Sequence, residues 1–134
     1  MADSRLAYLD ASAFVKLVSD EAESAALDTT LDAWPRWSSS ALLEIEGIRA
    51  ARRTSSLAYD AARALIGGME LVEIDADIRL AAAVLDDRGL RTLDAIHLAT
   101  ALSLGERCGA FFAYDERLIA AARAHGLSVT VPRP

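Results

Sequence analysis

Short apolar segments of strand length alternate with helix-forming segments along the whole chain, and this alternation limits the possible folds more than any other feature. The expected strands are residues 6–9, a short strand introduced by residues 34–37, and residues 70–74, 109–114 and 127–131. The first expected helix starts with residues 13–17, and the second runs from residue 20 to about residue 33. The third runs from 41 to about 53, with the serines at 38–40 as its cap residues, and the fourth follows a restart at 54–56 and ends near 67–68. The last three cover residues 77–87, 92–104 and 115–124. This order predicts an α/β domain with a mostly parallel central sheet flanked by helices on both faces.

Size and composition predict a single domain over residues 1–134, because 53% of the residues are apolar and can form one core. No apolar run approaches the ~20 residues that span a bilayer, and the N-terminus does not resemble a secretory signal. Cys108 is the only cysteine, so no intrachain disulfide can form. We therefore expect a cytoplasmic protein without membrane contact.

The net charge of −6 restricts how the chain could bind nucleic acid. Phosphate affinity usually comes from Lys and Arg, so the charge argues against a broad nucleic-acid-binding surface. A metal site changes this argument, because carboxylates that hold a divalent cation count as negative although the loaded site attracts phosphate. Arginines are also available, whereas Lys16 is the only lysine.

Two aspartates each follow a predicted strand directly. Asp10 follows residues 6–9, and Asp115 follows the strand that ends at Tyr114. Ligands bind beyond the carboxyl ends of parallel strands, so these two carboxylates can lie close together in a functional site. Each could instead be the N-cap of the helix that follows it, although Ser12 could cap the first of these helices equally well. The sequence leaves both interpretations open.

Asp94 lies at the start of the predicted helix 92–104, which is apolar nearly all round and should be buried. A carboxylate buried without a partner is costly. Capping by Thr92 or Asp94 itself would explain part of this placement, but it would not supply a cation.

Glu46 follows two leucines, Leu42 and Leu43, by about one helical turn, so it shares their apolar face. Glu44 has a more polar setting, which makes Glu46 the better candidate for an inward-facing acid. The alternative is a solvated Glu46 paired with Arg49.

Together, these four acids indicate a divalent cation. Two carboxylates about 4 Å apart repel by about 4 kcal/mol at an effective dielectric constant near 20, so gathered carboxylates raise one another's pKa or recruit a cation. Hard oxygen ligands favour Mg²⁺ or Mn²⁺ over zinc. We expect His97 to be a packed or hydrogen-bonded helix residue, and His125 is the only other histidine. Cys108, Trp34 and Trp37 are expected to be packing residues.

Four segments, in order, resemble the motifs of PIN-domain nucleases. They are residues 8–13 (YLDASA), 46–50 (EGIRA), 93–99 (LDAIHLA) and 114–118 (YDERL). Each segment is weakly specific by itself, but their order and spacing agree across nearly the whole chain. Within this family the chain is most similar to the bacterial VapC-type toxins of toxin–antitoxin pairs, which are equally short.

The resemblance implies a magnesium-dependent ribonuclease in which Asp10, Glu46, Asp94 and Asp115 hold one or two Mg²⁺ ions, with Mn²⁺ as a substitute. In this hypothesis three aspartates are the metal ligands, with Asp10 and Asp94 central, and Glu46 orients or deprotonates the attacking water. The resemblance also implies single-stranded or structured RNA as substrate, a homodimer, and a cognate antitoxin protein that blocks the toxin.

Three further residues are candidates for supporting roles. Ser12 could hydrogen-bond a ligand carboxylate, and Lys16 or Arg49 could contact a substrate phosphate. The chain departs from the family at Ala113, where many members carry Thr or Ser two residues before the last aspartate. A hydroxyl expected near Asp115 is therefore missing.

Two other functions compete with this hypothesis. A catalytically weak or inactive PIN-fold module could bind a basic partner peptide in its acidic pocket, and Ala113 favours this alternative. A phosphatase or phospho-receiver domain is disfavoured, because the triplet after the first strand is Asp10-Ala11-Ser12 rather than Asp-x-Asp or an adjacent acidic pair. A late lysine, a P-loop and a Gly-x-Gly-x-x-Gly motif are also missing.

Overall fold

The computed structural model describes residues 5–86 and 89–134, and these form a five-stranded parallel sheet with helices on both faces. The elements are β1 (Leu6–Leu9), α1 (Ala11–Val18), α2 (Ser24–Leu31), β2 (Trp37–Ser40), α3 (Leu42–Thr54), α4 (Ser56–Gly67), β3 (Glu70–Val72), α5 (Ala76–Ala83), α6 (Thr92–Ser103), the 3₁₀ turn η1 (Gly105–Arg107), β4 (Cys108–Phe112), α7 (Glu116–Ala124) and β5 (Val129–Thr130). The strand order is β3-β2-β1-β4-β5, and every pairing is parallel. The predicted α/β class is confirmed.

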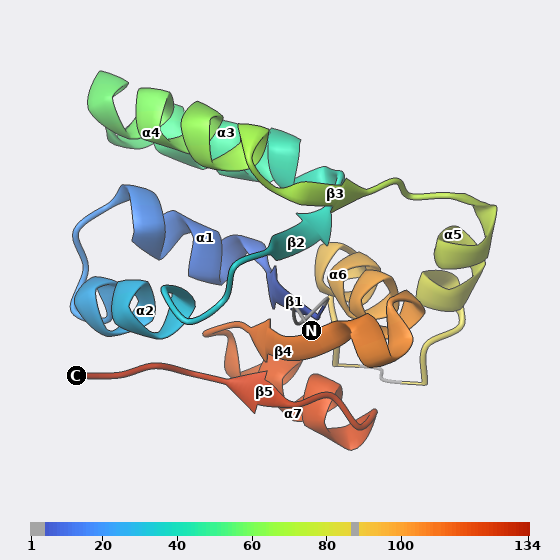
Figure 1. The fold of residues 1–134 in the computed structure, drawn as a ribbon. Coiled ribbons are helices and arrows are strands. Elements are labelled where there is room, and N and C mark those ends of the chain that lie inside the picture. Colours follow the sequence, from blue (N-terminus) through green and yellow to red (C-terminus); the bar gives the residue numbers. More distant parts are fainter. Residues whose placement is uncertain (1–4, 87–88) are drawn as a thin grey trace.

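The central strands bury side chains on both faces of the sheet, as parallel strands usually do. Tyr8 and Phe111 point to one face and pack in a cluster with residues of α6 and α7. Leu9 and Phe112 point to the opposite face and pack with residues of α1 and α2. Figure 1 shows this layering, with α1 and α2 on one side of the sheet and α5 and α6 on the other.

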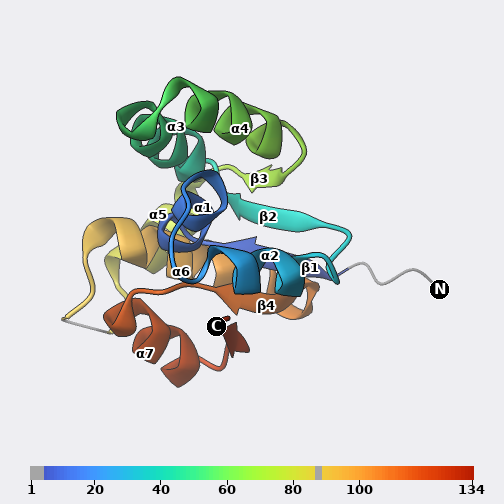
Figure 2. The same ribbon diagram turned by 90° about the vertical axis from the view of Figure 1, so that its left-hand side faces the viewer.

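Helices α3 and α4 form a hairpin that lies beside β3 and covers one end of the molecule (Figures 1 and 2). The hairpin is anchored by a buried cluster that includes Phe14 of α1 and Leu43 of α3. Its contact with α1 is close at Gly47, where an added methyl group would lie 2.7 Å from Cε2 of Phe14. The absence of a side chain at Gly47 therefore lets α3 approach α1, and this brings the neighbouring Glu46 towards the sheet.

The topology gathers the candidate acids at one place. The chain runs from β1 to β2 and β3 on one side and then returns to place β4 and β5 on the other, so the strand order reverses beside β1. Ligands bind at such a reversal, beyond the carboxyl ends of the strands. Asp10 directly follows β1, and its backbone N–H donates to the carbonyl oxygen of Phe112 at 3.1 Å. Asp115 begins the helical segment after β4.

One predicted assignment is confirmed only in part, at the second strand. The serines expected to cap the third helix form most of β2, which lies inside the sheet and is buried. Only Ser40 also contacts the start of α3, where its hydroxyl oxygen accepts a hydrogen bond from the N–H of Leu42 at 3.1 Å. Their hydroxyl groups have backbone partners: Ser38 donates to the carbonyl of Glu70 at 2.8 Å and Ser39 to that of Leu9 at 2.6 Å. Because these polar groups are satisfied, a serine-rich segment can lie in the core.

Other differences concern where elements begin and end. The strands expected over 70–74 and 127–131 are shorter, Glu70–Val72 and Val129–Thr130, because both lie at the edges of the sheet. The helix expected from 20 to about 33 begins at Ser24, whose hydroxyl accepts a hydrogen bond from the N–H of Glu21 and organises the preceding turn. The helix expected over 77–87 starts at Ala76, capped by Asp75, and ends at Ala83; residue 87 lies outside the described residues.

The helices are short compared with a bilayer. The longest, α3, has 13 residues, whereas a membrane-spanning helix needs about 20. Within residues 5–86 and 89–134, no helix is both long and apolar enough to cross a membrane.

Candidate functional site

A cleft of about 820 Å³ opens beside the carboxyl ends of β1 and β4. Its lining residues come from α1, the loop after it, α3, the start of α6 and the segment after β4: Ala11, Ser12, Val15, Lys16, Glu21, Leu42, Ile45, Glu46, Arg49, Ala50, Arg53, Leu93, Tyr114 and Asp115. Most of the predicted site residues therefore share one cleft. Of the other two, Asp10 is hydrogen-bonded to the lining residue Ser12, and Asp94 directly follows the lining residue Leu93.

Asp10 is buried, with 2% of its surface exposed. Its Oδ1 accepts hydrogen bonds from the backbone N–H of Ala13 at 2.9 Å and from the hydroxyl of Ser12 at 2.8 Å, so Asp10 does cap α1. Burial raises the pKa of this carboxyl to about 6, and the negative charge of Asp94 adds to the rise, although the hydrogen bonds and His97 oppose it. Asp10 is thus both the N-cap of α1 and a candidate site residue, and burial makes its negative charge energetically costly.

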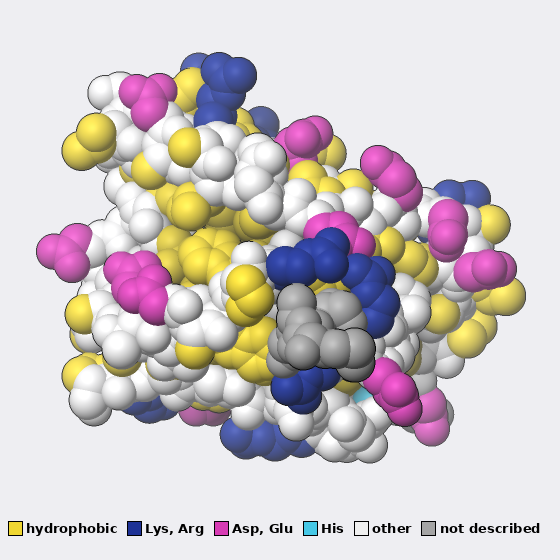
Figure 3. All heavy atoms as spheres, in the orientation of Figure 1, with side chains coloured by type: hydrophobic (Ala, Val, Ile, Leu, Met, Phe, Trp, Pro, Cys, Tyr) yellow, Lys and Arg dark blue, Asp and Glu magenta, His cyan; other side chains and the backbone are white. Residues whose placement is uncertain are grey.

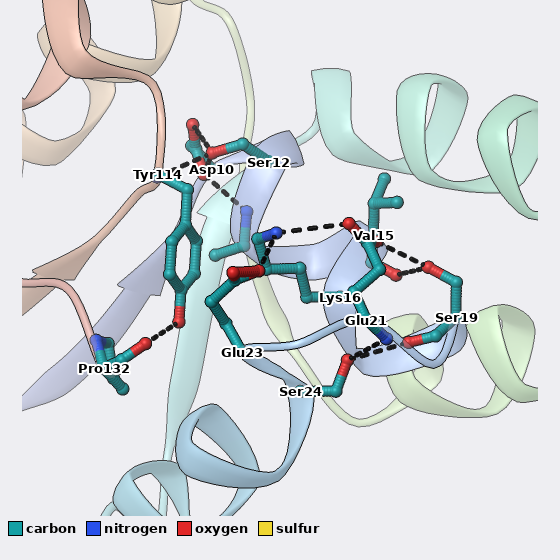
Figure 4. A network of polar contacts seen from close by, with 11 residues as sticks. Asp10, Ser12, Val15, Lys16, Ser19, Glu21, Glu23, Ser24, Tyr114 and Pro132 are labelled. Carbon is teal, nitrogen blue, oxygen red and sulfur yellow. Dashed lines mark hydrogen bonds and ion pairs between the residues drawn. The ribbon is translucent and has the colours of Figure 1, made fainter. Parts of the chain in front are cut away.

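Ser12 joins the ends of the two central strands. Its hydroxyl donates to Asp10 and accepts from the backbone N–H of Tyr114 at 2.9 Å (Figure 4). One side chain therefore orients the acid after β1 and fixes the backbone just before Asp115. Ala113 is fully buried in the apolar cluster on the Tyr8 face of the sheet, so the hydroxyl beside these acids comes from Ser12.

Asp94 is half-buried in the first turn of α6. Burial raises its pKa, and the negative charges of Asp115 and Glu46 raise it further. No described side chain caps α6, so the capping role considered for Thr92 or Asp94 is wrong. Asp94 thus lies among the other acids.

Asp115 is exposed and caps α7, accepting a hydrogen bond from the N–H of Leu118 at 3.0 Å. Its side chain also lines the cleft. As with Asp10, the capping interpretation is confirmed without removing the acid from the candidate site. Capping uses Oδ1 and leaves the second carboxylate oxygen available.

Glu46 is held by a histidine. Its Oε1 lies 2.8 Å from Nε2 of His97, so among the described residues it pairs with this histidine and not with Arg49. His97 is 1% exposed, which confirms the expectation of a packed, hydrogen-bonded residue. Its other ring nitrogen, Nδ1, lies 2.7 Å from the hydroxyl oxygen of Tyr8. Sequence reasoning missed both contacts, although His97 follows Asp94 by one helical turn on the same side of the helix.

The two candidate phosphate contacts differ in their surroundings. Lys16 Nζ lies 2.7 Å from Oε1 of Glu23 and 3.2 Å from Oε1 of Glu21, and it also lies 4.8 Å from the ring centre of Tyr114 (Figure 4). Its charge is therefore already balanced. Arg49 is exposed in the cleft wall, and no described acid lies within ion-pair distance of it.

A family model described as the PIN domain matches residues 7–126, a span that includes all four candidate acids. The chain belongs to the PIN-domain family. The resemblance found in the four sequence segments is therefore confirmed.

Among PIN-domain proteins, the chain is similar to several VapC proteins of Mycobacterium tuberculosis. Ribonuclease VapC35 is 44% identical over 129 residues, which cover 93% of this chain and 96% of that protein. Ribonuclease VapC46 is 41% identical over 125 residues, with the same coverage. The chain is thus a VapC-type PIN domain, as its motifs predicted.

Two solved structures share the PIN fold of this chain. The crystal structure of Mycobacterium tuberculosis VapC20, described as a sarcin–ricin loop cleaving toxin, has a TM-score of 0.72 at 20% identity and covers 95% of this chain and 98% of its own. A toxin–antitoxin complex from Klebsiella pneumoniae has a TM-score of 0.66 at 22% identity, covering 85% and 90%. At these identities the likeness concerns the fold alone.

The donor set of this PIN domain fits a hard divalent cation, because its candidate ligands are carboxylate oxygens. In the described part of the chain, no three Asp, Glu, His or Cys side chains are already grouped closely enough to hold a metal ion. Three of the carboxylates are instead engaged by protein donors: Asp10 by Ala13, Glu46 by His97 and Asp115 by Leu118. The residues therefore match such a cation in the chemistry of their oxygens, although in this structure they do not form a closed set of ligands.

The raised pKa of Asp10 predicts a stabilising substitution. The pKa of this carboxyl is about 6 in the folded protein, against an ordinary value of 3.8 that applies to the unfolded chain. The folded state therefore binds the proton more tightly, and this group's contribution to stability falls as the pH rises through that interval. In metal-free protein at about pH 7.5, Asp10→Asn should raise the free energy of unfolding by up to about 3 kcal/mol, since asparagine retains the N-cap.

Urea unfolding of both proteins measures this effect, and the gain should shrink at about pH 5, where Asp10 is mostly protonated. Equal gains at the two pH values would contradict the assignment, as would destabilisation at about pH 7.5.

Proposed function

We propose that this chain is a Mg²⁺-dependent endoribonuclease that hydrolyses RNA phosphodiester bonds, and that it is the toxin of a type II toxin–antitoxin pair. The proposal is supported by one observation on four separate segments: Glu46 and Asp115 line one cleft, and the pKa values of Asp10 and Asp94 respond to the charges of neighbouring candidate acids. The names of the relatives, ribonucleases VapC35 and VapC46, support the activity.

Each acid has a separate part in this hypothesis. Asp10, Asp94 and Asp115 would hold the metal, and Glu46 would orient the attacking water and accept its proton. A bound Mg²⁺ supplies a Lewis acid that lowers the pKa of water and stabilises charge on the leaving oxygen. The hydroxyl of Ser12 keeps Asp10 oriented through its hydrogen bonds.

The α3–α4 hairpin supplies positive charge for the RNA backbone. Arg49 and Arg53 line the cleft beside Glu46, and Arg52 and Arg63 lie against the ring of Tyr59 at 6.0 and 5.8 Å from its centre. Figure 3 shows basic side chains on the outer surface of this hairpin. In a chain of net charge −6, such a local group of arginines can contact phosphates. We assign the phosphate contact to Arg49 because Lys16 is already paired.

The proposal includes two protein partners. Leu93 and Ile45 line the cleft and are 48% and 61% exposed, so an antitoxin segment could cover them and block the acids. The similar solved structure described as a toxin–antitoxin complex supports this partner. Leu80 and Val84 are exposed near one another at the end of α5 and could be covered by a second copy in a homodimer. Sedimentation equilibrium of the purified chain tests the dimer.

The alternative is a catalytically weak or inactive PIN module whose acidic cleft binds a basic peptide. The observation in its favour is Ala113, which leaves position 113 without the hydroxyl that many family members carry. This alternative and the nuclease predict opposite results in a cleavage assay.

Incubation with structured and single-stranded RNA distinguishes the two functions. We expect endonucleolytic products with Mg²⁺ or Mn²⁺, and a loss of cleavage to background after chelation that is reversed by excess metal. Sequencing the ends of products from total cellular RNA would identify the target. Binding of a basic peptide without metal-dependent cleavage of any RNA would favour the alternative.

A further inference from the structure

A chain of hydrogen bonds runs from the centre of the sheet to the cleft. The hydroxyl of Tyr8 in β1 lies 2.7 Å from Nδ1 of His97, and Nε2 of His97 lies 2.8 Å from Oε1 of Glu46. Tyr8 is fully buried and His97 is 1% exposed, whereas Glu46 is half-buried and lines the cleft. These hydrogen bonds connect β1, α6 and α3. Tyr8 and His97 are 89 residues apart in the sequence, and His97 and Glu46 are 51 residues apart.

The chemistry of these groups fixes the direction of the chain. An ionised carboxylate only accepts hydrogen bonds, so Nε2 of His97 must carry the proton that it shares with Glu46. When the imidazole is neutral, its Nδ1 is bare and accepts from the hydroxyl of Tyr8. Burial keeps the pKa of the Tyr8 phenol well above its usual value, so this hydroxyl retains its proton. Tyr8 and Glu46 thereby favour the same neutral tautomer of His97, the one that can donate to Glu46.

We propose that Tyr8 and His97 are positioning residues that hold one oxygen of Glu46 and leave the other free to orient the attacking water. The inference rests on the proposed nuclease function and extends it to two residues outside the acid set. Glu46 needs such support because its side chain has several rotatable bonds. Its neighbours in the sequence of α3, the exposed Ile45 and the buried Gly47, do not hold its carboxylate. The packing of Tyr8 on Phe111, with ring centres 5.3 Å apart and planes at 7°, fixes the first member of the chain.

The tautomer of His97 is a direct readout that does not depend on activity. The chain has two histidines, so ¹⁵N-labelled histidine gives two resolvable ring systems, and His125→Gln assigns them. In metal-free protein whose His97 ring is neutral, we expect the ring proton to lie on Nε2. Tyr8→Phe, which keeps the aromatic ring but removes the hydroxyl, should shift the Nδ1 resonance of His97, because this nitrogen loses its hydrogen-bond partner. A single proton on Nδ1 in the wild type, or an unchanged His97 spectrum in Tyr8→Phe, would overturn the proposal.

Kinetics test the consequence for Glu46. We expect Tyr8→Phe to lower kcat for RNA cleavage by about tenfold and His97→Leu by about 100-fold, with KM within about twofold of wild type. His97→Gln should recover part of the loss, because its amide can donate to Glu46. His125→Gln, a change on the exposed end of α7, is the matched control and should retain wild-type kinetics.

The outcomes separate this inference from the proposed function. Absence of cleavage by the wild type would reject the nuclease, and with it the role for Glu46. Cleavage by the wild type with unchanged kcat in Tyr8→Phe and His97→Leu would reject the positioning role alone. Equal losses in His97→Gln and His97→Leu would also reject it, since a packing defect would then explain both. Circular dichroism and melting curves of each variant identify any that fail to fold, and the wild-type tautomer remains decisive in that case.

Discussion

Asp94→Asn is expected to lower the rate of metal-dependent RNA cleavage by at least about 100-fold. Asp94 interacts electrostatically with the other three candidate acids. Its negative charge raises the pKa of Asp10, and the charges of Asp115 and Glu46 raise the pKa of Asp94. Asparagine has nearly the same shape but lacks the negative charge that a hard cation requires. Single-turnover cleavage of a defined RNA at saturating Mg²⁺ measures the chemical step.

The chain offers a matched control for this substitution. Asp77 occupies the first turn of α5, as Asp94 occupies the first turn of α6, but Asp77 is exposed, and neither it nor a residue next to it lines the cleft. Asp77→Asn should therefore cleave within about twofold of wild type, because it makes the same charge change at an equivalent helical position. Asp94→Asn should also remain folded, since it removes a repelled carboxylate. Wild-type cleavage by Asp94→Asn would contradict the assignment of the site.

Mg²⁺ is expected to stabilise the folded wild-type protein strongly. A ligand that binds only the folded state adds about 2.7 kcal/mol at a hundredfold excess over its Kd, which for a domain of this size raises the Tm by about 10 °C. The physical reason is that the cation would balance the negative charge of these carboxylates. Burial and repulsion from neighbouring acids disfavour that charge, as the raised pKa of Asp94 indicates. Calorimetry with a Mg²⁺ titration measures the shift.

Two comparisons test whether the rise in Tm comes from Mg²⁺ binding at the candidate acids. KCl at matched ionic strength should change the Tm far less, because it screens charges without coordinating them. Asp94→Asn should reduce the Mg²⁺-dependent shift, whereas Asp77→Asn should retain it in full. A shift of the same size in Asp94→Asn would place the binding elsewhere, and no shift in the wild type would argue against a metal site.

Much of the candidate site could be predicted because the order of elements decides where strands end. Asp10 and Asp115 follow neighbouring parallel strands, and the carboxyl ends of such strands share one edge of a sheet. Glu46 was predicted from helical periodicity, which also explains why Glu44 points to solvent. Asp94 was predicted because a carboxylate at the start of a buried apolar helix is costly without a partner. These are local patterns, and a single sequence contains them.

The prediction was wrong where long-range contacts outweigh local preference. The serines of β2 have the composition of a turn or cap, yet they are buried because backbone carbonyls of neighbouring strands accept their hydroxyl protons. The role of Lys16 at a substrate phosphate stays a prediction, and the structure adds that the turn after α1 brings Glu21 and Glu23 onto its ammonium group.

The sequence by itself determined the α/β class, the family and the choice of candidate acids, because spacing and periodicity are properties of nearby residues. Only the tertiary structure decided that Ser12 bridges the ends of β1 and β4, and that Tyr8 reaches Glu46 through His97. A hydrogen bond depends on positions within about 3 Å, and residues 89 and 51 positions apart reach that separation only when the strands and helices between them pack.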